Sequence, residues 1–573
     1  MAGVAERRTG RAGGLIALAT VAALLPGCAG IPTDSPVEAA TPGEGDGRSD
    51  VRIEAQPPQT GATPTQIVEG FLDAMSSYQL GFPLAEEFLT PDARDGWGRD
   101  AIDVYNSTTL EETQPGLVEL VADPAARIDG AGRFSAAAPT SAPLIHTFRL
   151  ALVEVDERGE WRIVNPPNVL LISSFDLSRT YSPFVTYFPD PSGQVLVPDR
   201  VWLPAAEPQL ATLLAQAVVD GPTDLIGPRG VANPFPPDTV VTGGAISGGR
   251  TVVTVALPAP PIGESDGAAR RLMVAQLADT MTQLPQVEVV LTLGGQVVDV
   301  SDASGALAAL AGFSDPPAYV LTEDNAVLVA DPTRASDLVP VAGPLGRGEV
   351  PCKSLAVSLD RTVAATVDET GTQVLRTSLT EDGTPVLVYQ GEDVGPLSFD
   401  RYGNLWLVDR RSGGRASEVK LVQPDGTVVT VAAPDLAGLR VIDLRVAVDG
   451  VRVAVVTEGP TGGLRLGHVV RGAAPELALT VALPFDGTVT DVAWAGPTEL
   501  LVVATPPGGL PRPYTVSIDG ATVTEGSVTG ITAVAAYATR LAFARTDASN
   551  VLRQTSVLQW DQVTTGKSVT YPG

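Results

Sequence analysis

The chain contains one motif with the spacing of a nucleophilic serine. Residues 263–267 read Gly-Glu-Ser-Asp-Gly, the G-x-S-x-G pattern in which Ser265 would attack an acyl carbon. Such an elbow needs a sharp turn that joins a buried strand directly to a helix, whereas prolines at positions 258, 260 and 261 separate the two here. The base of a triad would have to be His146 or His468, which fall in different predicted domains. We therefore predict that Ser265 lies in a loop, and a hydrolase built on it is the third hypothesis for function.

A second reactive group is the thiol of Cys28. Three arginines within the first 11 residues precede an apolar run at residues 15–25, which is too short to cross a bilayer as a helix. Leu25-Pro26-Gly27-Cys28 then resembles a bacterial lipobox, although Pro26 stands where a small or β-branched residue is more usual. We predict that residues 1–27 are a lipoprotein signal peptide and that Cys28 carries a diacylglyceryl thioether. The alternative is an ordinary secreted protein with an incidental cysteine.

Metal binding has few candidate ligands. His146 precedes a predicted strand and is expected to be structural, whereas His468 lies in an Arg- and Gly-rich hairpin and is expected to be exposed. With Cys28 lipidated, only Cys352 remains, so a histidine- or cysteine-based zinc site is not expected. Several aspartates lack the closely spaced oxygen partners that calcium requires and are predicted to form turns. These are Asp360, Asp400, Asp409 and Asp449. We predict no metal and no cofactor.

Residues 565–568, Thr-Gly-Lys-Ser, imitate the end of a phosphate-binding loop. Asp561 stands where that loop requires its first glycine, and the segment is predicted to be a C-terminal strand. We do not expect a nucleotide site there.

The charge balance limits the possible partners. The chain of 573 residues has a formal net charge of −28, and removal of residues 1–27 leaves −30 because that segment holds three arginines and one glutamate. Such an acidic surface repels nucleic acid and anionic lipid head groups and favours cationic partners. No other apolar run approaches 18 residues, so we expect no second membrane segment.

Order is expected to begin after a tether. Residues 28–61 are rich in Gly, Pro, Ser, Thr, Asp and Glu and are predicted to be disordered. Residues 62–178 are predicted to form a small α+β domain of the NTF2-like kind. Its first helix starts at Thr63-Pro64-Thr65-Gln66, with an N-cap threonine and glutamine at N3. A polar, loop-rich middle follows, and residues 147–155 then pair with residues 161–164 as a hairpin.

Residues 180–303 are predicted to form a second α+β module with the order β-α-β-β-α-β-β. Residues 195–203 are strand-like, and Gly221-Pro222 ends the helix that follows. A second helix carries Met273, Leu277, Met281 and Leu284 on one stripe.

Residues 316–573 change in character, because helical periodicity gives way to short strands and Asp/Gly turns. One phrase, as in Leu355-Ala356-Val357-Ser358-Leu359-Asp360, recurs at intervals of roughly 40 to 50 residues, the period of four-stranded propeller blades. Residues 319–321 and 326–329 form a degenerate first copy. The expected architecture is thus multidomain, α+β followed by an all-β propeller of about six blades, with a β-sandwich array as the alternative.

This order of segments resembles the LpqB lipoprotein family of actinobacteria, and the central segment resembles the GerMN module of spore-germination proteins. The residues that carry the second resemblance are Val197-Pro198, Leu213-Leu214, Asp220-Gly221-Pro222 and the stretch from Gln276 to Pro285. The resemblance implies an accessory lipoprotein on the extracytoplasmic face of the cell membrane that contacts the sensor kinase of an MtrAB-like two-component system and affects cell-wall homeostasis and division. It implies no catalytic residues.

Two binding functions therefore compete. The leading hypothesis is a lipid-anchored regulator of a sensor kinase. The runner-up is a lipoprotein that binds cell-wall carbohydrate or peptidoglycan, because Trp406, Trp494 and Trp560 could stack on sugars. The simpler interpretation of these tryptophans is that they fill the gaps between blades.

Overall fold

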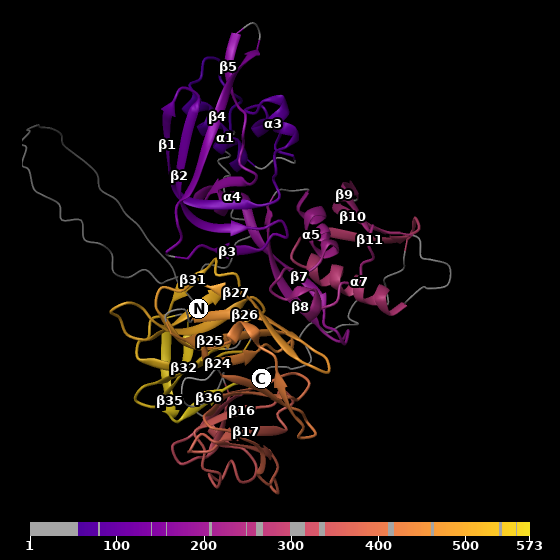
Figure 1. Cartoon of the computed structure of the whole chain (residues 1–573). Coiled ribbons are helices and arrows are strands. Elements are labelled where there is room, and N and C mark those ends of the chain that lie inside the picture. Colours follow the sequence, from indigo (N-terminus) through magenta and orange to yellow (C-terminus); the bar gives the residue numbers. More distant parts are fainter. Residues whose placement is uncertain are drawn as a thin grey trace, which may run out of the picture. The chain divides into compact units, whose positions relative to one another are not determined.

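The computed structural model describes residues 55–573, apart from residues 78–80, 139, 156–157, 206–208, 248, 259–266, 298–315, 332–337, 411–416, 460–462, 538–540 and 557. The described residues belong to one compact unit, Glu54–Gly573. Figure 1 shows the chain and labels many of its helices and strands. None of the helices in the described ranges is long and apolar enough to span a bilayer.

The N-terminal domain packs short helices against a six-stranded sheet with strand order β5-β4-β2-β1-β6 and β3 added beside β2. Its elements are α1 (Pro64–Ser76), α2 (Pro83–Glu86), α3 (Pro91–Asp95), β1 (Ile102–Gln114), β2 (Leu117–Ile128), β3 (Phe134–Ala136), β4 (Leu144–Val155), β5 (Arg158–Ile163), β6 (Leu170–Ser173) and α4 (Ser174–Thr180).

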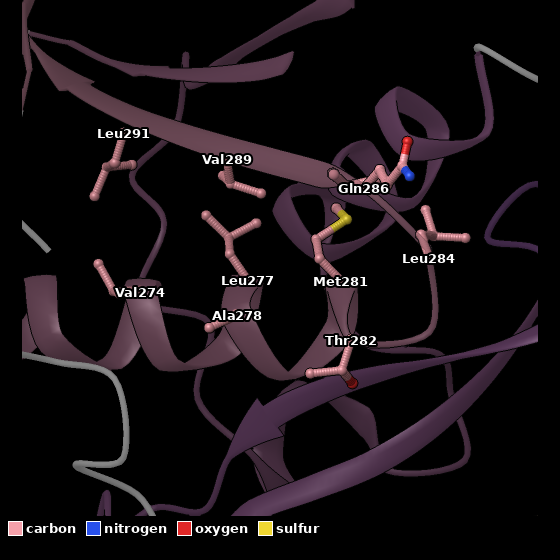
Figure 2. Close-up of a pocket in the computed structure, with 10 residues that line it drawn as sticks. Val274, Leu277, Ala278, Met281, Thr282, Leu284, Gln286, Val289 and Leu291 are labelled. Carbon is pink, nitrogen blue, oxygen red and sulfur yellow. The ribbon is translucent and has the colours of Figure 1, made fainter. Parts of the chain in front are cut away.

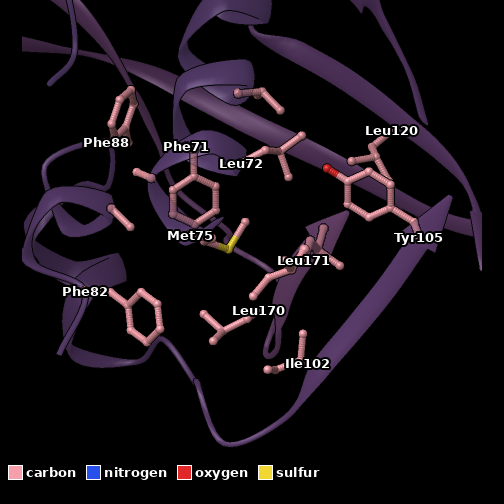
Figure 3. Packing of buried hydrophobic residues seen from close by; sticks show 14 of the residues in the cluster. Phe71, Leu72, Met75, Phe82, Phe88, Ile102, Tyr105, Leu120, Leu170 and Leu171 are labelled. Carbon is pink, nitrogen blue, oxygen red and sulfur yellow. The ribbon is translucent and has the colours of Figure 1, made fainter. Parts of the chain in front are cut away.

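Helix α1 begins where the sequence predicts. Thr63 Oγ1 accepts the backbone N–H of Gln66 at 3.3 Å, and Gln66 Oε1 accepts the backbone N–H of Thr63 at 2.9 Å, which completes a capping box. The apolar face of α1, with Phe71, Leu72 and Met75, packs on the sheet in a buried core (Figure 3).

The prediction of a loop-rich middle was wrong. Most of that region is the long hairpin of β1 and β2, the two strands being joined at Gly116 with φ +75°. The end of β1 near Gln114 extends beyond the core, and its side chains are mostly exposed. Exposed polar side chains remove the apolar alternation by which a half-buried strand is recognised in sequence. The predicted hairpin of β4 and β5 is confirmed.

The central module adds one strand and one short helix to the predicted order. Its elements are β7 (Tyr181–Pro189), β8 (Leu196–Pro204), α5 (Gln209–Asp220), α6 (Gly227–Gly230), β9 (Val240–Ser247), β10 (Arg250–Leu257), α7 (Gly267–Met281), β11 (Val287–Leu293) and β12 (Gln296–Val297). They form the pair β7-β8 and the sheet β12-β11-β10-β9, in which β10 and β11 run parallel. The strand that sequence reasoning missed is β7. Helices α5 and α7 share a buried core with the strands.

The C-terminal region forms six four-stranded antiparallel sheets within the described residues, which confirms the predicted propeller. Blade 1 contains β13 (Ala318–Leu321), β14 (Val327–Ala330), β15 (Leu338–Pro340) and β36 (Ser568–Thr570). Blade 2 contains β16 (Ser354–Val357), β17 (Val363–Val367), β18 (Gln373–Ser378) and β19 (Val386–Gln390). Blade 3 contains β20 (Val394–Phe399), β21 (Leu405–Asp409), β22 (Glu418–Val422) and β23 (Val428–Val431).

A short 3-10 helix, η1 (Pro434–Leu436), precedes blade 4. Blade 4 contains β24 (Arg440–Val446), β25 (Arg452–Glu458), β26 (Gly463–Val470) and β27 (Glu476–Leu483). Blade 5 contains β28 (Thr488–Trp494), β29 (Glu499–Thr505), β30 (Arg512–Ser517) and β31 (Val523–Glu525). Blade 6 contains β32 (Ile531–Ala535), β33 (Phe543–Thr546), β34 (Asn550–Ser556) and β35 (Gln559–Thr565).

The first blade closes the ring with strands from both ends of the propeller. C-terminal β36 pairs with β13, with Thr570 opposite Tyr319. The hydroxyl of Tyr571 also donates to the backbone oxygen of Leu541 in blade 6 at 2.6 Å. Pairing of the last strand with the first blade holds the ends of the ring together.

Candidate functional site

A cavity of about 390 Å³ opens between α7 and β11 in the central module. One wall is a stripe of α7, and the other comes from alternate residues of β11. Figure 2 shows Leu277 and Met281 rising from the helix toward Val289 on the strand. The lining residues are Val274, Leu277, Ala278, Met281, Thr282, Leu284, Gln286, Val287, Val289 and Leu291. We call this cavity the α7–β11 groove.

The groove can bind apolar groups. Its volume is within the range of roughly 300 to 1,000 Å³ that ligand pockets span, and most of its walls are aliphatic. Polar atoms on its lining come from Thr282 and Gln286, whose side chains are exposed. None of the lining residues is charged or is a histidine or a cysteine, so the groove provides shape and apolar area rather than acid–base or metal chemistry.

The opposite face of α7 is fixed against the free edge of β7. Gln283 Oε1 accepts the N–H of Val185 at 2.8 Å, while Gln283 Nε2 donates to the Val185 carbonyl at 2.6 Å. One turn earlier, Thr280 Oγ1 accepts the N–H of Tyr187 at 3.3 Å. Thr280 on α7 and Gln283 just after it thus satisfy an edge of β7 that has no neighbouring strand among the described residues, and this anchors the helix that forms the groove wall.

The central module and the propeller share one buried cluster. Phe188, Val197, Leu225, Ile226 and Val231 of the module are buried together with residues of blades 4 and 5. Polar contacts surround this cluster.

The charged contacts of this junction come from both sides. Arg229 binds both carboxylate oxygens of Glu476, at 2.9 and 3.1 Å. Asp519 Oδ2 accepts from Trp202 Nε1 at 2.9 Å and lies 3.1 Å from Arg200 Nε. The junction therefore combines apolar burial with directed polar bonds.

His468 lies at this junction, so the prediction that it is exposed was wrong. Its side chain is 4% exposed, and its Nδ1 lies 3.1 Å from the carbonyl oxygen of Leu225. Burial lowers the pKa of His468 below its usual value. The local pattern of Arg and Gly is typical of an exposed hairpin, but the burying surface comes from a segment more than 200 residues earlier in the chain.

His146 has the structural role that the sequence predicts. It lies within β4, its ring meets that of Phe148 edge-on with centroids 4.5 Å apart, and Nε2 lies 3.1 Å from the backbone oxygen of Asn165. The two histidines are in different modules, as expected. Ser265 and Cys28 lie outside the described residues. No group of three or more potential metal ligands occurs among the residues that the structure describes.

The aspartates chosen from the sequence mostly shape turns. Asp360, Asp400 and Asp449 each accept backbone N–H groups two or more residues ahead, as predicted. Asp409 differs, because it ends β21 and accepts from the Tyr389 hydroxyl at 2.9 Å and the Glu392 N–H at 3.0 Å. It therefore braces the connection between two blades rather than a hairpin turn.

Lys567 also proves to be a brace. Its Nζ donates to Asn325 Oδ1 at 2.7 Å and pairs with Glu369 at 2.6 Å, directly before β36. A phosphate-loop lysine would need to be aimed at an open anion site, whereas this amine ties blade 1 to blade 2.

The tryptophans pack between strands. Trp406 is fully buried and donates to Asp400 Oδ2 at 3.0 Å. Trp494 is 8% exposed, donates to the carbonyl of Arg445 at 3.1 Å, and has the guanidinium of Arg452 above its ring. Trp560 is half-buried beside the cluster of blades 5 and 6. Two of the three rings are thus unable to stack on a sugar.

Three family models match successive parts of the chain. Residues 57–178 match a model described as "Lipoprotein LpqB, N-terminal domain", residues 185–299 match Germane, "Sporulation and spore germination", and residues 328–572 match "Lipoprotein LpqB beta-propeller domain". A lipoprotein LpqB of Thermobifida fusca is 31% identical, over 97% of this chain and 98% of its own length. The chain belongs to the LpqB lipoprotein family.

A lipoprotein LpqB of Streptomyces coelicolor is 30% identical, with 96% of each chain covered. Members of the LpqB family are lipoproteins, so this chain is a lipid-anchored membrane protein. The resemblance seen from sequence is confirmed along with the three-part architecture.

The structure shows what the residues of the GerMN-like motif contact in this LpqB family member. In the stretch from Gln276 to Pro285, Thr280 on α7 and Gln283 just after it bind the edge of β7. The groove is lined by Leu277 and Met281 on α7 and by Leu284 after it. The same ten residues therefore both anchor the helix and form the α7–β11 groove.

Proposed function

We propose that this LpqB family member is an extracytoplasmic accessory protein, anchored through a diacylglyceryl group on Cys28, that binds the extracytoplasmic domain of a sensor kinase and modulates its signalling. The observation that carries the proposal is the match to LpqB lipoproteins over essentially the whole chain. An effect on cell-wall homeostasis and division would follow from an MtrAB-like kinase. We propose that the protein acts by binding and not as an enzyme.

Anchoring is testable separately from partner binding. Cys28→Ser should prevent acylation and move the protein from the membrane to the soluble fraction, whereas Cys352→Ser changes the other cysteine and should leave fractionation unchanged. Mass spectrometry of the mature N-terminus measures acylation directly. A Cys28→Ser protein that remains processed, acylated and membrane-bound would contradict the proposed anchor.

The α7–β11 groove is the surface that we propose for partner contact. An open apolar cavity on a lipoprotein with a strongly acidic chain suits a partner that inserts apolar side chains and carries basic residues around them. Ala278 lines the groove and is exposed, so an arginine there would fill the cavity with a charge without disturbing the core.

The partner experiment compares two arginine substitutions on one helix. Ala278→Arg should weaken capture of the purified kinase extracytoplasmic domain by roughly tenfold, equal to about 1.4 kcal/mol. Ala268→Arg is the matched control, since Ala268 is exposed on α7 and does not line the groove. Equal capture by both variants would remove the groove from the proposal. The function itself would be refuted if the unaltered membrane-bound protein captured no kinase and kinase output stayed normal after deletion of the protein. In that case, sedimentation of the protein with purified cell wall would support the carbohydrate hypothesis.

A further inference from the structure

The ring of His468 is enclosed by two glycines of another module. A Cβ atom built on Gly227 would lie 2.5 Å from His468 Cε1, and one built on Gly230 would lie 2.8 Å from Cδ2. Gly227 also has φ +53°, a conformation that side chains disfavour. Only glycine at both positions lets α6 approach the imidazole so closely. The segment Thr223–Val231 of the central module therefore fits around one side chain of blade 4.

The hydrogen bond of the ring fixes which nitrogen carries the proton. The Leu225 carbonyl can only accept, so Nδ1 of His468 donates across the 3.1 Å contact. Nε2 is then the atom that would take up a second proton. In the described part of the chain no hydrogen bond to Nε2 is formed, and a second proton would place a positive charge on a side chain that is 4% exposed.

Charged groups approach the ring from every neighbouring element. Burial lowers the pKa of His468 most, and the hydrogen bond to Leu225 opposes it. Arg229 of α6 lowers the pKa further, while Glu476 of β27 and Asp224 raise it. Glu476 is itself engaged by Arg229. From β25, Arg452 lies directly across the strand pair from His468, and its charge is matched by Asp449 Oδ2 at 2.7 Å.

Further bonds hold the same segment to the propeller and to its own module. Thr480 Oγ1 of β27 donates to the backbone oxygen of Asp224 at 2.8 Å. At the start of the segment, Asp199 Oδ2 accepts the N–H of Thr223 at 2.6 Å. Ile226 and Val231 bury their side chains in the shared cluster. The segment Thr223–Val231 is thus bonded to β27 of the propeller and to Asp199 of its own module, in addition to its contact with His468.

We propose that Thr223–Val231 is a pH-sensitive latch that holds the central module on blade 4 while His468 is neutral and loosens when His468 takes up a proton. The sign follows from linkage. Because the folded pKa of His468 lies below the unfolded value, the latch is fully held above the ordinary histidine pKa of about 6.5 and is weakened as the pH falls through the folded pKa. Acidification would therefore loosen the junction of two modules without unfolding either core.

Amide hydrogen exchange on the full-length protein in detergent micelles tests the latch. Between about pH 7.5 and about pH 5.5, protection of residues 224–232, corrected for intrinsic rates, should fall by about threefold or more. His468→Gln keeps a donor for the Leu225 carbonyl without a titrating imidazole, so the fall in protection between these two pH values should be absent. His146→Gln is the matched control and should retain the wild-type response. Unchanged wild-type protection, or the same fall in His468→Gln, would overturn the proposal.

A second measurement does not depend on any variant folding. The chain has two histidines, so NMR of the selectively labelled wild-type protein can follow both titrations. The midpoint of His468 should lie below that of an ordinary histidine and should coincide with the loss of protection in residues 224–232. A His468 titration with no accompanying change in exchange would also refute the latch.

Discussion

The hydroxyl of Tyr402, in the propeller, donates a 2.6 Å hydrogen bond to Asp190 Oδ2 at the end of β7. Burial raises the pKa of Asp190, but the bonds from Ser192, Tyr402 and the Val195 and Gln194 N–H groups outweigh it, and the net pKa is lowered. The same bond, after burial, contributes to raising the pKa of Tyr402 to about 12. This hydrogen bond thus couples the ionisation of Asp190 in the central module to that of Tyr402 in the propeller.

Tyr402→Phe should weaken this junction by about 1 to 2 kcal/mol, because it removes a hydrogen bond to a charged acceptor while keeping the ring. It should also raise the pKa of Asp190. Since a lowered carboxyl pKa stabilises the fold above the unfolded value of 3.8, the loss should be clear at neutral pH and should shrink in acid. Urea unfolding at several pH values measures it. A variant with wild-type stability at neutral pH would contradict the assigned role of the bond.

Asp199 should give the opposite pH dependence. Burial raises its pKa to about 6 from 3.8, although Thr223 donates both its N–H and its hydroxyl to the carboxylate. The folded protein therefore holds this proton to higher pH than the unfolded chain, and stability falls as pH rises through about 4 to about 6. The contribution is at most about 3 kcal/mol. The difference in unfolding free energy between wild type and Asp199→Asn, followed across that range, should reveal it, and a difference independent of pH would count against it.

The N-terminal core offers a matched pair of phenylalanines. Phe71 is fully buried, with its ring centroid 5.2 Å from that of Trp97, so Phe71→Ala should cost about 3 to 5 kcal/mol. Phe175 is 64% exposed, and Phe175→Ala should change the unfolding free energy by less than about 0.5 kcal/mol. Thermal and chemical unfolding of the two variants compare these costs, and similar losses would mean that the core is not packed as described.

Closure of the propeller depends on strand β36. Val569 is 6% exposed and pairs with Val320 on β13, so Val569→Asp should bury an unpaired charge at the closing sheet and lower stability by about 3 kcal/mol or more. Val523→Asp, on the exposed outer strand of blade 5, is the control and should be nearly neutral. Equal stability of the two variants would show that the ring does not depend on this strand.

The sequence is sufficient to predict those features that depend on residues close together in the chain. The capping box at Thr63 acts within four residues, and the hairpin of β4 and β5 is marked by a turn between two apolar runs. The propeller was visible because the same short strand phrase recurs, each copy burying its own apolar side chains. The GerMN-like stretch from Gln276 was recognised as a motif, although its two-sided role was not.

Sequence patterns do not predict a residue's role where its contacts come from a distant part of the chain. The exposed end of β1 lacks the alternation of a half-buried strand, so the β1–β2 hairpin was missed. Asp409 is predicted from its residue type to form a turn, whereas its acceptor role depends on Tyr389 in another blade.

The sequence by itself determined the three modules, the first helix and the repeat that forms the propeller, since each depends on the periodicity or turn chemistry of neighbouring residues. Only the tertiary structure decided that α7 and β11 leave an open groove and that His468 is buried. In both cases the surface is built from segments that are distant in the sequence and meet only on folding. The residues next to a side chain in the sequence therefore do not show whether another segment covers it.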